Sequence, residues 1–156
     1  MTVDATTGTR RAPISIPRLI GRLALGSFLV FAGISHLAWN REAFLAQVPT
    51  WLPLEGDFVV IASGVVEILL GLSLLLLARW QVQVGWIVAL FFLAIFPGNI
   101  SQFVTATDSF GLNSDLSRGI RLLFQPVLVA WALWSTGAWR AWRARRAAKP
   151  IPHGVC

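Results

Sequence analysis

Cysteine and charged residues are scarce in this sequence of 156 residues. The one cysteine, Cys156, allows neither an internal disulfide nor a CxxC redox pair. Charged residues make up 13% of the chain, whereas typical soluble domains have about 25%. Hydrophobic residues make up 56%, and the mean hydropathy is +0.68. This composition excludes an ordinary soluble globular domain and indicates an integral membrane protein.

Motifs for self-contained metal or redox chemistry are also missing. The sequence has no HExxH motif, no cysteine cluster and no glycine-rich phosphate loop. A bis-histidine haem site needs two intramembrane histidines, and only His36 lies in an apolar segment. We therefore expect no metal site, no cofactor that the sequence alone identifies and no self-contained catalytic motif.

Long apolar segments are abundant instead. Four windows are long enough to cross about 30 Å of hydrocarbon at about 1.5 Å per residue; they cover residues 19–39, 58–78, 84–104 and 119–139. They lack the alternation of barrel strands, which predicts helices. The connections are short, so consecutive helices should be antiparallel neighbours. The predicted fold is all-α, an antiparallel bundle of four transmembrane helices.

Basic residues are distributed unequally along the chain. Ten of the thirteen lie before or just inside the first window, at Arg79, or in the tail. The positive-inside rule then places both termini in the cytoplasm. This predicts a cytoplasmic arm (1–18), a transmembrane domain (19–139) and a cytoplasmic basic tail (140–156). An arginine-rich tail directly after a span indicates binding to anionic lipids of the bilayer, and we expect no nucleic-acid partner.

Two segments depart from simple helical spans. The loop of residues 40–56 is too apolar for a solvated loop, and Pro49 and Pro53 prevent a continuous helix there. We expect it to lie in the outer interface as a lid over the mouth of the bundle. In the third window, Pro97, Gly98 and Asn99 should interrupt the helix and free backbone carbonyls.

Polar side chains within the apolar windows are the candidate functional residues, because such groups are costly in a membrane. Helical rise places all of them between the midplane and the outer boundary: His36, Glu67, Asn99, Arg121 and Gln125. Glycines share a helical face with His36 and with Glu67, which indicates close helix packing there. We predict an outward-facing polar chamber, with His36 and Glu67 as catalytic or proton-relay residues and the other three as cofactor-binding residues.

Each candidate also has a structural interpretation. Glu67 is then a protonated or Arg121-paired acid that only stabilises the bundle. His36 is a hydrogen-bonding residue near the interface, and Arg121 is an interfacial anchor. Asn99 and Gln125 are interhelical hydrogen-bond partners. The sequence leaves these alternatives open.

Five short motifs, in order between Leu23 and Trp134, resemble the DoxX-like family of bacterial four-helix membrane proteins. The resemblance lies in the order of all five motifs along the chain rather than in any single one. Together the motifs contain all the candidate residues: Phe31–His36, Val48–Pro53, Ser63–Glu67, Phe96–Ile100 and Arg121–Gln125.

The resemblance implies a redox-linked accessory subunit of the bacterial cytoplasmic membrane. Members of that family are associated with thiosulfate-to-quinone oxidation and with complexes that handle thiol and oxidative stress. A quinone is therefore the candidate cofactor, and an oxidoreductase or a second copy of the chain is the candidate partner. This sequence departs from relatives with redox cysteines in the membrane, since Cys156 lies in the tail. The alternative is a non-enzymatic small-molecule binder or carrier, or a structural assembly factor.

Overall fold

The computed structural model describes residues 15–106 and 115–148. Most of the predicted N-terminal arm, the end of the tail with Cys156, and residues 107–114 lie outside this part. The described residues form helices and no strands. The helices are α1 (Ile16–Leu37), α2 (Arg41–Leu45), α3 (Gly56–Leu76), α4 (Gln81–Val104), α5 (Asp115–Ser135) and α6 (Ala138–Ala147), with a short 3-10 turn at Ala78–Trp80.

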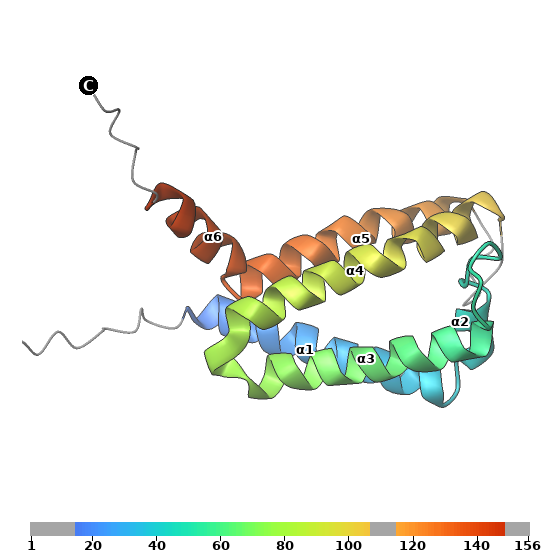
Figure 1. Cartoon of the computed structure of the whole chain (residues 1–156), viewed down its shortest axis with the longest axis horizontal. Coiled ribbons are helices and arrows are strands. Elements are labelled where there is room, and N and C mark those ends of the chain that lie inside the picture. The colour runs from blue at the N-terminus through green and yellow to red at the C-terminus, as the bar shows by residue number, and fades with distance from the viewer. Residues whose placement is uncertain (1–14, 107–114, 149–156) are drawn as a thin grey trace, which may run out of the picture.

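The long helices α1, α3, α4 and α5 lie side by side, with α2 at one end and α6 branching away at the other (Figure 1). By length and composition, α1, α3 and the stretch Ala78–Val104 could each cross a membrane. The pair Gly119–Ser135 and Ala138–Ala147 meets the same criterion only when taken together, and it is bent by 67°. The prediction of apolar helices of membrane-spanning length is therefore confirmed for three helices, or four if the bent pair counts as one.

The α5 helix ends earlier than the predicted window of residues 119–139. It stops at Ser135, and α6 begins at Ala138 after a turn at Gly137. Gly137 has a φ of 72°, a left-handed conformation that glycine adopts without the steric cost of a side chain. Thr136 is 1% exposed and its hydroxyl donates to the carbonyl of Ala132 (2.7 Å). A buried residue therefore fixes the point at which the chain turns.

The expected interruption at Pro97 is not found, because α4 runs continuously from Gln81 to Val104. Proline removes one backbone donor, so the carbonyl of Leu93 loses its usual helical partner. One residue earlier, the side-chain amide of Gln125 on α5 donates to the carbonyl of Phe92 (2.6 Å). A neighbouring helix thus supplies a polar donor close to the carbonyl that the proline leaves free, although it bonds to the carbonyl one residue before it.

Glycines allow α1 and α3 to pack closely. A Cβ atom on Gly33 would lie 2.5 Å from the carbonyl oxygen of Gly64, and one on Gly71 would lie 2.6 Å from that of Gly26. The predicted glycine faces therefore meet in the structure. The main packing partner of α1 is α3, and that of α4 is α5. The bundle thus consists of two closely packed helix pairs with a seam between them.

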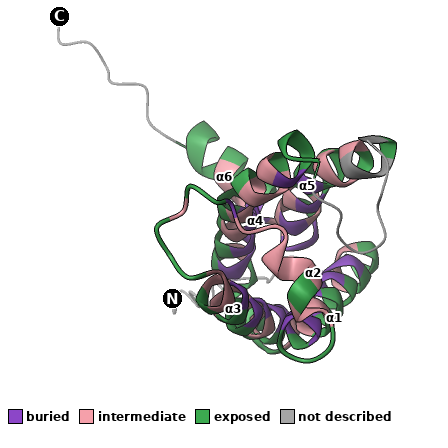
Figure 2. Cartoon of the chain, turned by 90° about the vertical axis from the view of Figure 1, so that its right-hand side faces the viewer, coloured by how far each residue is buried: buried purple, intermediate pink, exposed green. Residues whose placement is uncertain are grey.

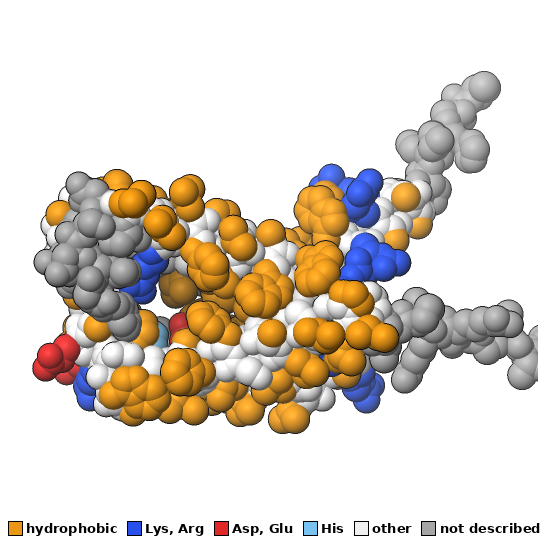
Figure 3. Space-filling model, turned by 180° about the vertical axis from the view of Figure 1, so that it is seen from behind, with side chains coloured by type: hydrophobic (Ala, Val, Ile, Leu, Met, Phe, Trp, Pro, Cys, Tyr) orange, Lys and Arg blue, Asp and Glu red, His pale blue; other side chains and the backbone are white. Residues whose placement is uncertain are grey.

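Apolar side chains cover both the inside and the outside of the bundle. Figure 2 shows buried residues on the inward faces of the helices and exposed ones on the outward faces. Leu25, Leu29, Leu74, Val88 and Phe92 belong to the core. Hydrophobic side chains also cover the outer flank in Figure 3, and large exposed ones occur on every long helix. An apolar surface this extensive is unusual for a soluble monomer.

Candidate functional site

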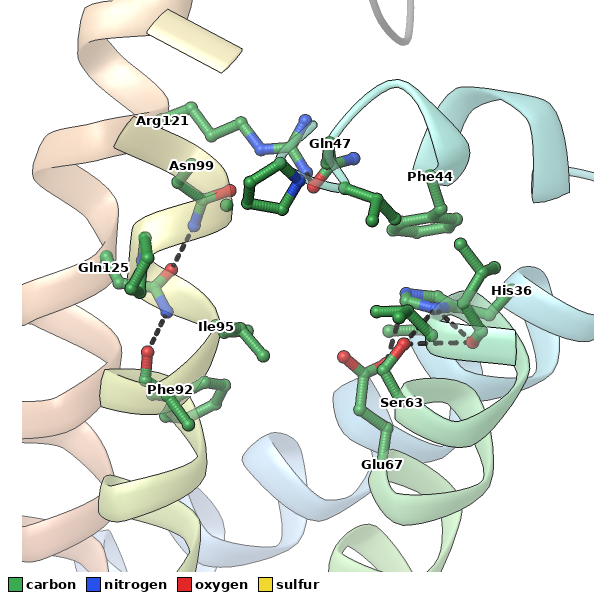
Figure 4. Close-up of a pocket in the computed structure, with 18 of the residues that line it drawn as sticks. His36, Phe44, Gln47, Ser63, Glu67, Phe92, Ile95, Asn99, Arg121 and Gln125 are labelled. Atoms are coloured by element: carbon green, nitrogen blue, oxygen red, sulfur yellow. Dashed lines mark hydrogen bonds and ion pairs between the residues drawn. The ribbon is translucent and has the colours of Figure 1, made fainter. Parts of the chain in front are cut away.

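A cavity of about 530 Å³ lies at the α2 end of the bundle. Its volume falls in the range of about 300 to 1,000 Å³ that is usual for ligand sites. The candidate residues of all four long helices line it: His36, Glu67, Asn99, Arg121 and Gln125. Figure 4 shows that they form two polar walls, one on α1 and α3 and the other on α4 and α5, on opposite sides of the cavity.

The first wall is built around His36 and Glu67, which are both 6% exposed. The Nε2 atom of His36 lies 3.5 Å from Oε2 of Glu67. The hydroxyl of Ser63 donates to the carbonyl of Val60 (2.9 Å) and lies 3.1 Å from Nδ1 of His36. With a proton on Nδ1, Ser63 accepts a hydrogen bond and Nε2 becomes an acceptor that faces Glu67. The wall therefore contains two groups that can exchange a proton.

Local sequence explains why these side chains meet. Ser63 and Glu67 are four residues apart on α3 and so share one face of that helix. Gly64 lies between them, and a Cβ atom there would be 2.8 Å from Cβ of His36. Glycine at this position lets α1 bring His36 next to α3. The ring of Phe44 then covers the imidazole, with a distance of 3.4 Å between the ring centroids.

The second wall is a hydrogen-bonded pair of amides on α4 and α5. Asn99 Nδ2 donates to Gln125 Oε1 (2.9 Å), and Gln125 Nε2 donates to the carbonyl of Phe92 (2.6 Å). Arg121, one helical turn before Gln125, donates from Nη2 to Oε1 of Gln47 (2.6 Å). Each amide nitrogen carries two hydrogens, so each keeps donor capacity for a ligand.

The ion pair between Glu67 and Arg121 that was one interpretation of the sequence is not found among the described residues. Within them His36 is the group at ion-pair distance from Glu67, and Arg121 contacts Gln47 of the loop. Glu67 Oε2 is buried, and no hydrogen bond reaches it from the described part of the chain. A buried acceptor without a donor is costly unless a ligand or water supplies one. A hydrogen-bond donor on a molecule in the cavity would satisfy this oxygen.

The loop of residues 40–56 closes one end of the cavity. Phe44, Gln47, Val48, Pro49, Trp51 and Leu52 of the loop line it, as expected for a lid. A Cβ atom on Gly98 would lie 2.9 Å from the carbonyl oxygen of Gln47, so glycine lets the loop rest against α4. Arg41 and Asp57 form an ion pair (2.8 Å) between the beginnings of α2 and α3. Both side chains are partly exposed, so this pair adds little stability.

The sequence did not single out Ser63, Phe44 or Gln47 as site residues. Ser63 could have been found from its spacing of one helical turn to Glu67. The contacts of Phe44 and Gln47 depend on how the loop folds over the helices, which no local pattern reveals. Within residues 15–106 and 115–148, no three side chains of His, Cys, Asp or Glu lie close enough together to hold a metal ion.

The cavity is also open on one side, between α1 and α5. Phe28 of α1 and Phe124 of α5 both line it, and each is 47% exposed. Figure 3 shows a hollow on this flank, in which basic, acidic and histidine side chains are visible among hydrophobic ones. The site therefore combines polar groups inside with an apolar opening, which suits a molecule with a polar head and an apolar tail.

The comparisons with known proteins give a family. The family model described as "Domain of unknown function (DUF8561)" matches residues 25–136, so the chain belongs to that family. The match begins within α1, continues to the end of α5 and includes every residue of both polar walls. No curated protein and no solved structure matches the chain.

Proposed function

We propose that this DUF8561 protein is a multi-pass membrane protein that binds the headgroup of a quinone in its cavity, as an accessory subunit of a redox-linked system. One observation carries the proposal: polar side chains from all four long helices line a single cavity whose side opening is apolar. The resemblance to the DoxX-like family supports the redox setting.

The proposed topology is four antiparallel spans with both termini in the cytoplasm of a bacterial cell. Apart from α5, three helices have the length and composition of a membrane span. The 21 residues of α5 measure roughly 30 Å along the helix axis, which equals the hydrocarbon thickness. Arginines of α6 follow α5 directly, as expected for a segment retained on the cytoplasmic side. In this topology the 40–56 loop and the cavity lie toward the outer face.

A quinone suits the cavity because its two carbonyl oxygens lie on opposite sides of an apolar ring. Asn99 and Gln125 offer donors on one wall, and His36 and Glu67 offer protonatable groups on the other. Phe92 and Ile95 supply apolar surface between the walls. The isoprenoid tail would leave between Phe28 and Phe124, directly into the bilayer. A quinone, when bound, carries electrons and protons together.

The part that this chain itself would perform is proton transfer. His36 and Glu67 are close enough to pass a proton between them, with Ser63 holding the imidazole in place. Phe44 and the loop exclude water from this wall. The electrons would come from a partner oxidoreductase.

The proposal is tested by native mass spectrometry of the protein extracted directly from cells into lipid nanodiscs. Wild-type protein is compared with Glu67→Gln and with a matched control, Glu55→Gln. Glu55 is exposed and does not line the cavity, so the control makes the same chemical change elsewhere. We expect bound quinone in wild type and in Glu55→Gln. Glu67→Gln should retain about tenfold less of the reduced quinol form, whose hydroxyl would donate to the Glu67 carboxylate; this is equivalent to about 1.4 kcal/mol, close to the scale of one hydrogen bond to a charged group.

The other outcomes of this experiment have clear meanings. A different small molecule that is lost only in Glu67→Gln would favour a non-redox binder or carrier, which the apolar opening also suits. Equal quinone in all three proteins would place quinone outside the cavity and contradict the proposal. Absence of any bound molecule in wild type would leave the structural assembly role as the better explanation.

A further inference from the structure

A second groove, of about 430 Å³, lies at the opposite end of the bundle from the cavity. Its walls come from the beginning of α1, the second half of α5 and the beginning of α6. The bend between α5 and α6 creates it, because α6 turns away from the bundle at Gly137. None of the residues of the polar walls line this groove.

The floor of the groove is apolar and follows α5. Pro126, Val129, Ala130 and Leu133 lie along one side of that helix and line the groove. The same side continues to Trp134, which is 47% exposed, and to Trp139 of α6, which is 48% exposed. From Pro126 to Leu133 the strip extends for roughly 10 Å along the helix axis, so it can contact part of an acyl chain, and tryptophan is typical of the interface between hydrocarbon and headgroups.

Two arginines flank the end of this strip. Arg18 of α1 and Arg140 of α6 both line the groove. The Nη1 atom of Arg18 lies 3.8 Å from where a Cβ atom of Gly137 would be, so the guanidinium sits at the bend itself. Within the described residues, the ion pairs are those of His36 with Glu67 and of Arg41 with Asp57, and neither groove arginine has a carboxylate partner.

We propose that this groove binds an anionic glycerophospholipid, with the acyl chain on the α5 strip and the phosphate between Arg18 and Arg140. Guanidinium groups form strong charge-assisted hydrogen bonds to phosphate oxygens. The apolar strip explains why the ligand is a lipid rather than a soluble phosphate, since the latter would leave it uncovered. The inference rests on the proposed membrane location, and it does not depend on what occupies the cavity.

The site is more specific than the general attraction of a basic surface for anionic lipids. Figure 3 shows several basic side chains gathered at this end of the molecule. Arg79 and Arg143 also belong to this end, but they do not line the groove. A diffuse attraction would use all of these arginines alike, whereas the groove singles out two.

The test compares lipid retention by full-length variants in nanodiscs of equal parts phosphatidylglycerol and phosphatidylcholine. The test variant is Arg18→Gln/Arg140→Gln, and the matched control is Arg79→Gln/Arg143→Gln, which removes the same charge. Native mass spectrometry measures the ratio of the two lipids that stay bound. We expect the wild-type preference for phosphatidylglycerol to fall at least fivefold in the test variant and to stay within twofold in the control. Equal losses in both would overturn the proposal.

A third variant tests the apolar strip without changing charge. Ala130 is exposed on the floor of the groove, so Ala130→Trp should fill it and reduce bound phosphatidylglycerol to the level of the test variant. Retention of phosphatidylglycerol by Ala130→Trp would mean that the arginines bind the phosphate alone, which would also overturn the proposal. The variant Arg18→Lys/Arg140→Lys keeps both positive charges and should retain part of the preference for phosphatidylglycerol. Its retention shows that the loss in the glutamine variant comes from the missing charges and not from misfolding.

Discussion

Single glycines set how closely α1 approaches α3, and that distance decides whether His36 can meet Glu67. The atom that a Cβ on Gly33 would meet is a backbone oxygen, at 2.5 Å, which cannot rotate away as a side chain can. We expect Gly33→Ala to push the helices apart and to destabilise the fold by about 1 to 3 kcal/mol, the usual cost of overpacking. Thermal unfolding in nanodiscs, followed by circular dichroism, measures the loss.

Gly119 provides the control for this substitution within the same chain. A Cβ atom there would have Phe103 as its nearest neighbour at 3.8 Å, an ordinary van der Waals contact. Gly119→Ala should therefore leave the melting temperature unchanged or raise it, because alanine favours a helix by up to about 1 kcal/mol. If Gly33→Ala melts at the wild-type temperature, α1 and α3 do not pack as closely as the structure has them.

The packing of the 40–56 loop against α4 should depend on Gly98. A side chain at Gly98 would meet the carbonyl of Gln47, which belongs to the loop and not to a packed helix. We expect Gly98→Val to lift the loop from α4, because the loop is the part that can move. Hydrogen exchange of the hydrogen-bonded backbone amides of Gln47, Val48 and Leu52 should become about tenfold faster, or about 1.4 kcal/mol less protected, while the melting temperature changes little. Unchanged exchange would contradict the contact.

Helix positions were predictable where a helix is long and apolar. The windows for α1, α3 and α4 agree with the structure to within three residues at each end, because length and hydropathy alone define such segments. The end of α5 was not predictable. Ser135, Thr136 and Gly137 interrupt the apolar run, but a glycine alone does not mark a helix end in this chain, because Gly64 and Gly71 lie inside α3. What stops the helix is the left-handed turn of Gly137 together with the packing of Thr136 against Gly85. The packing of Thr136 is a tertiary contact, which no local pattern reveals.

The candidate residues could be found from sequence because polar groups stand out in apolar windows, and helical rise gave their common depth. Their division into two walls could not be predicted from the sequence, because it depends on which helices are neighbours. The sequence allowed an Arg121–Glu67 pair, but pairing of α1 with α3 and of α4 with α5 puts these residues on opposite walls. The loop residues Phe44 and Gln47 then become the contacts of His36 and Arg121.

The arrangement of the whole chain in the membrane leads to a prediction that separates three spans from four. Glu55, in the loop before α3, and Arg145, on α6, are both exposed. Three spans between them would put them on opposite sides of the membrane, whereas two would put them on the same side. In a Cys156→Ser background, Glu55→Cys should react with a membrane-impermeant maleimide in intact spheroplasts. Arg145→Cys should react only after permeabilisation, because the arginines of α6 hold it on the cytoplasmic side. Labelling of both in intact spheroplasts would mean that α5 does not cross, and the proposed cavity would then lack a transmembrane fourth wall.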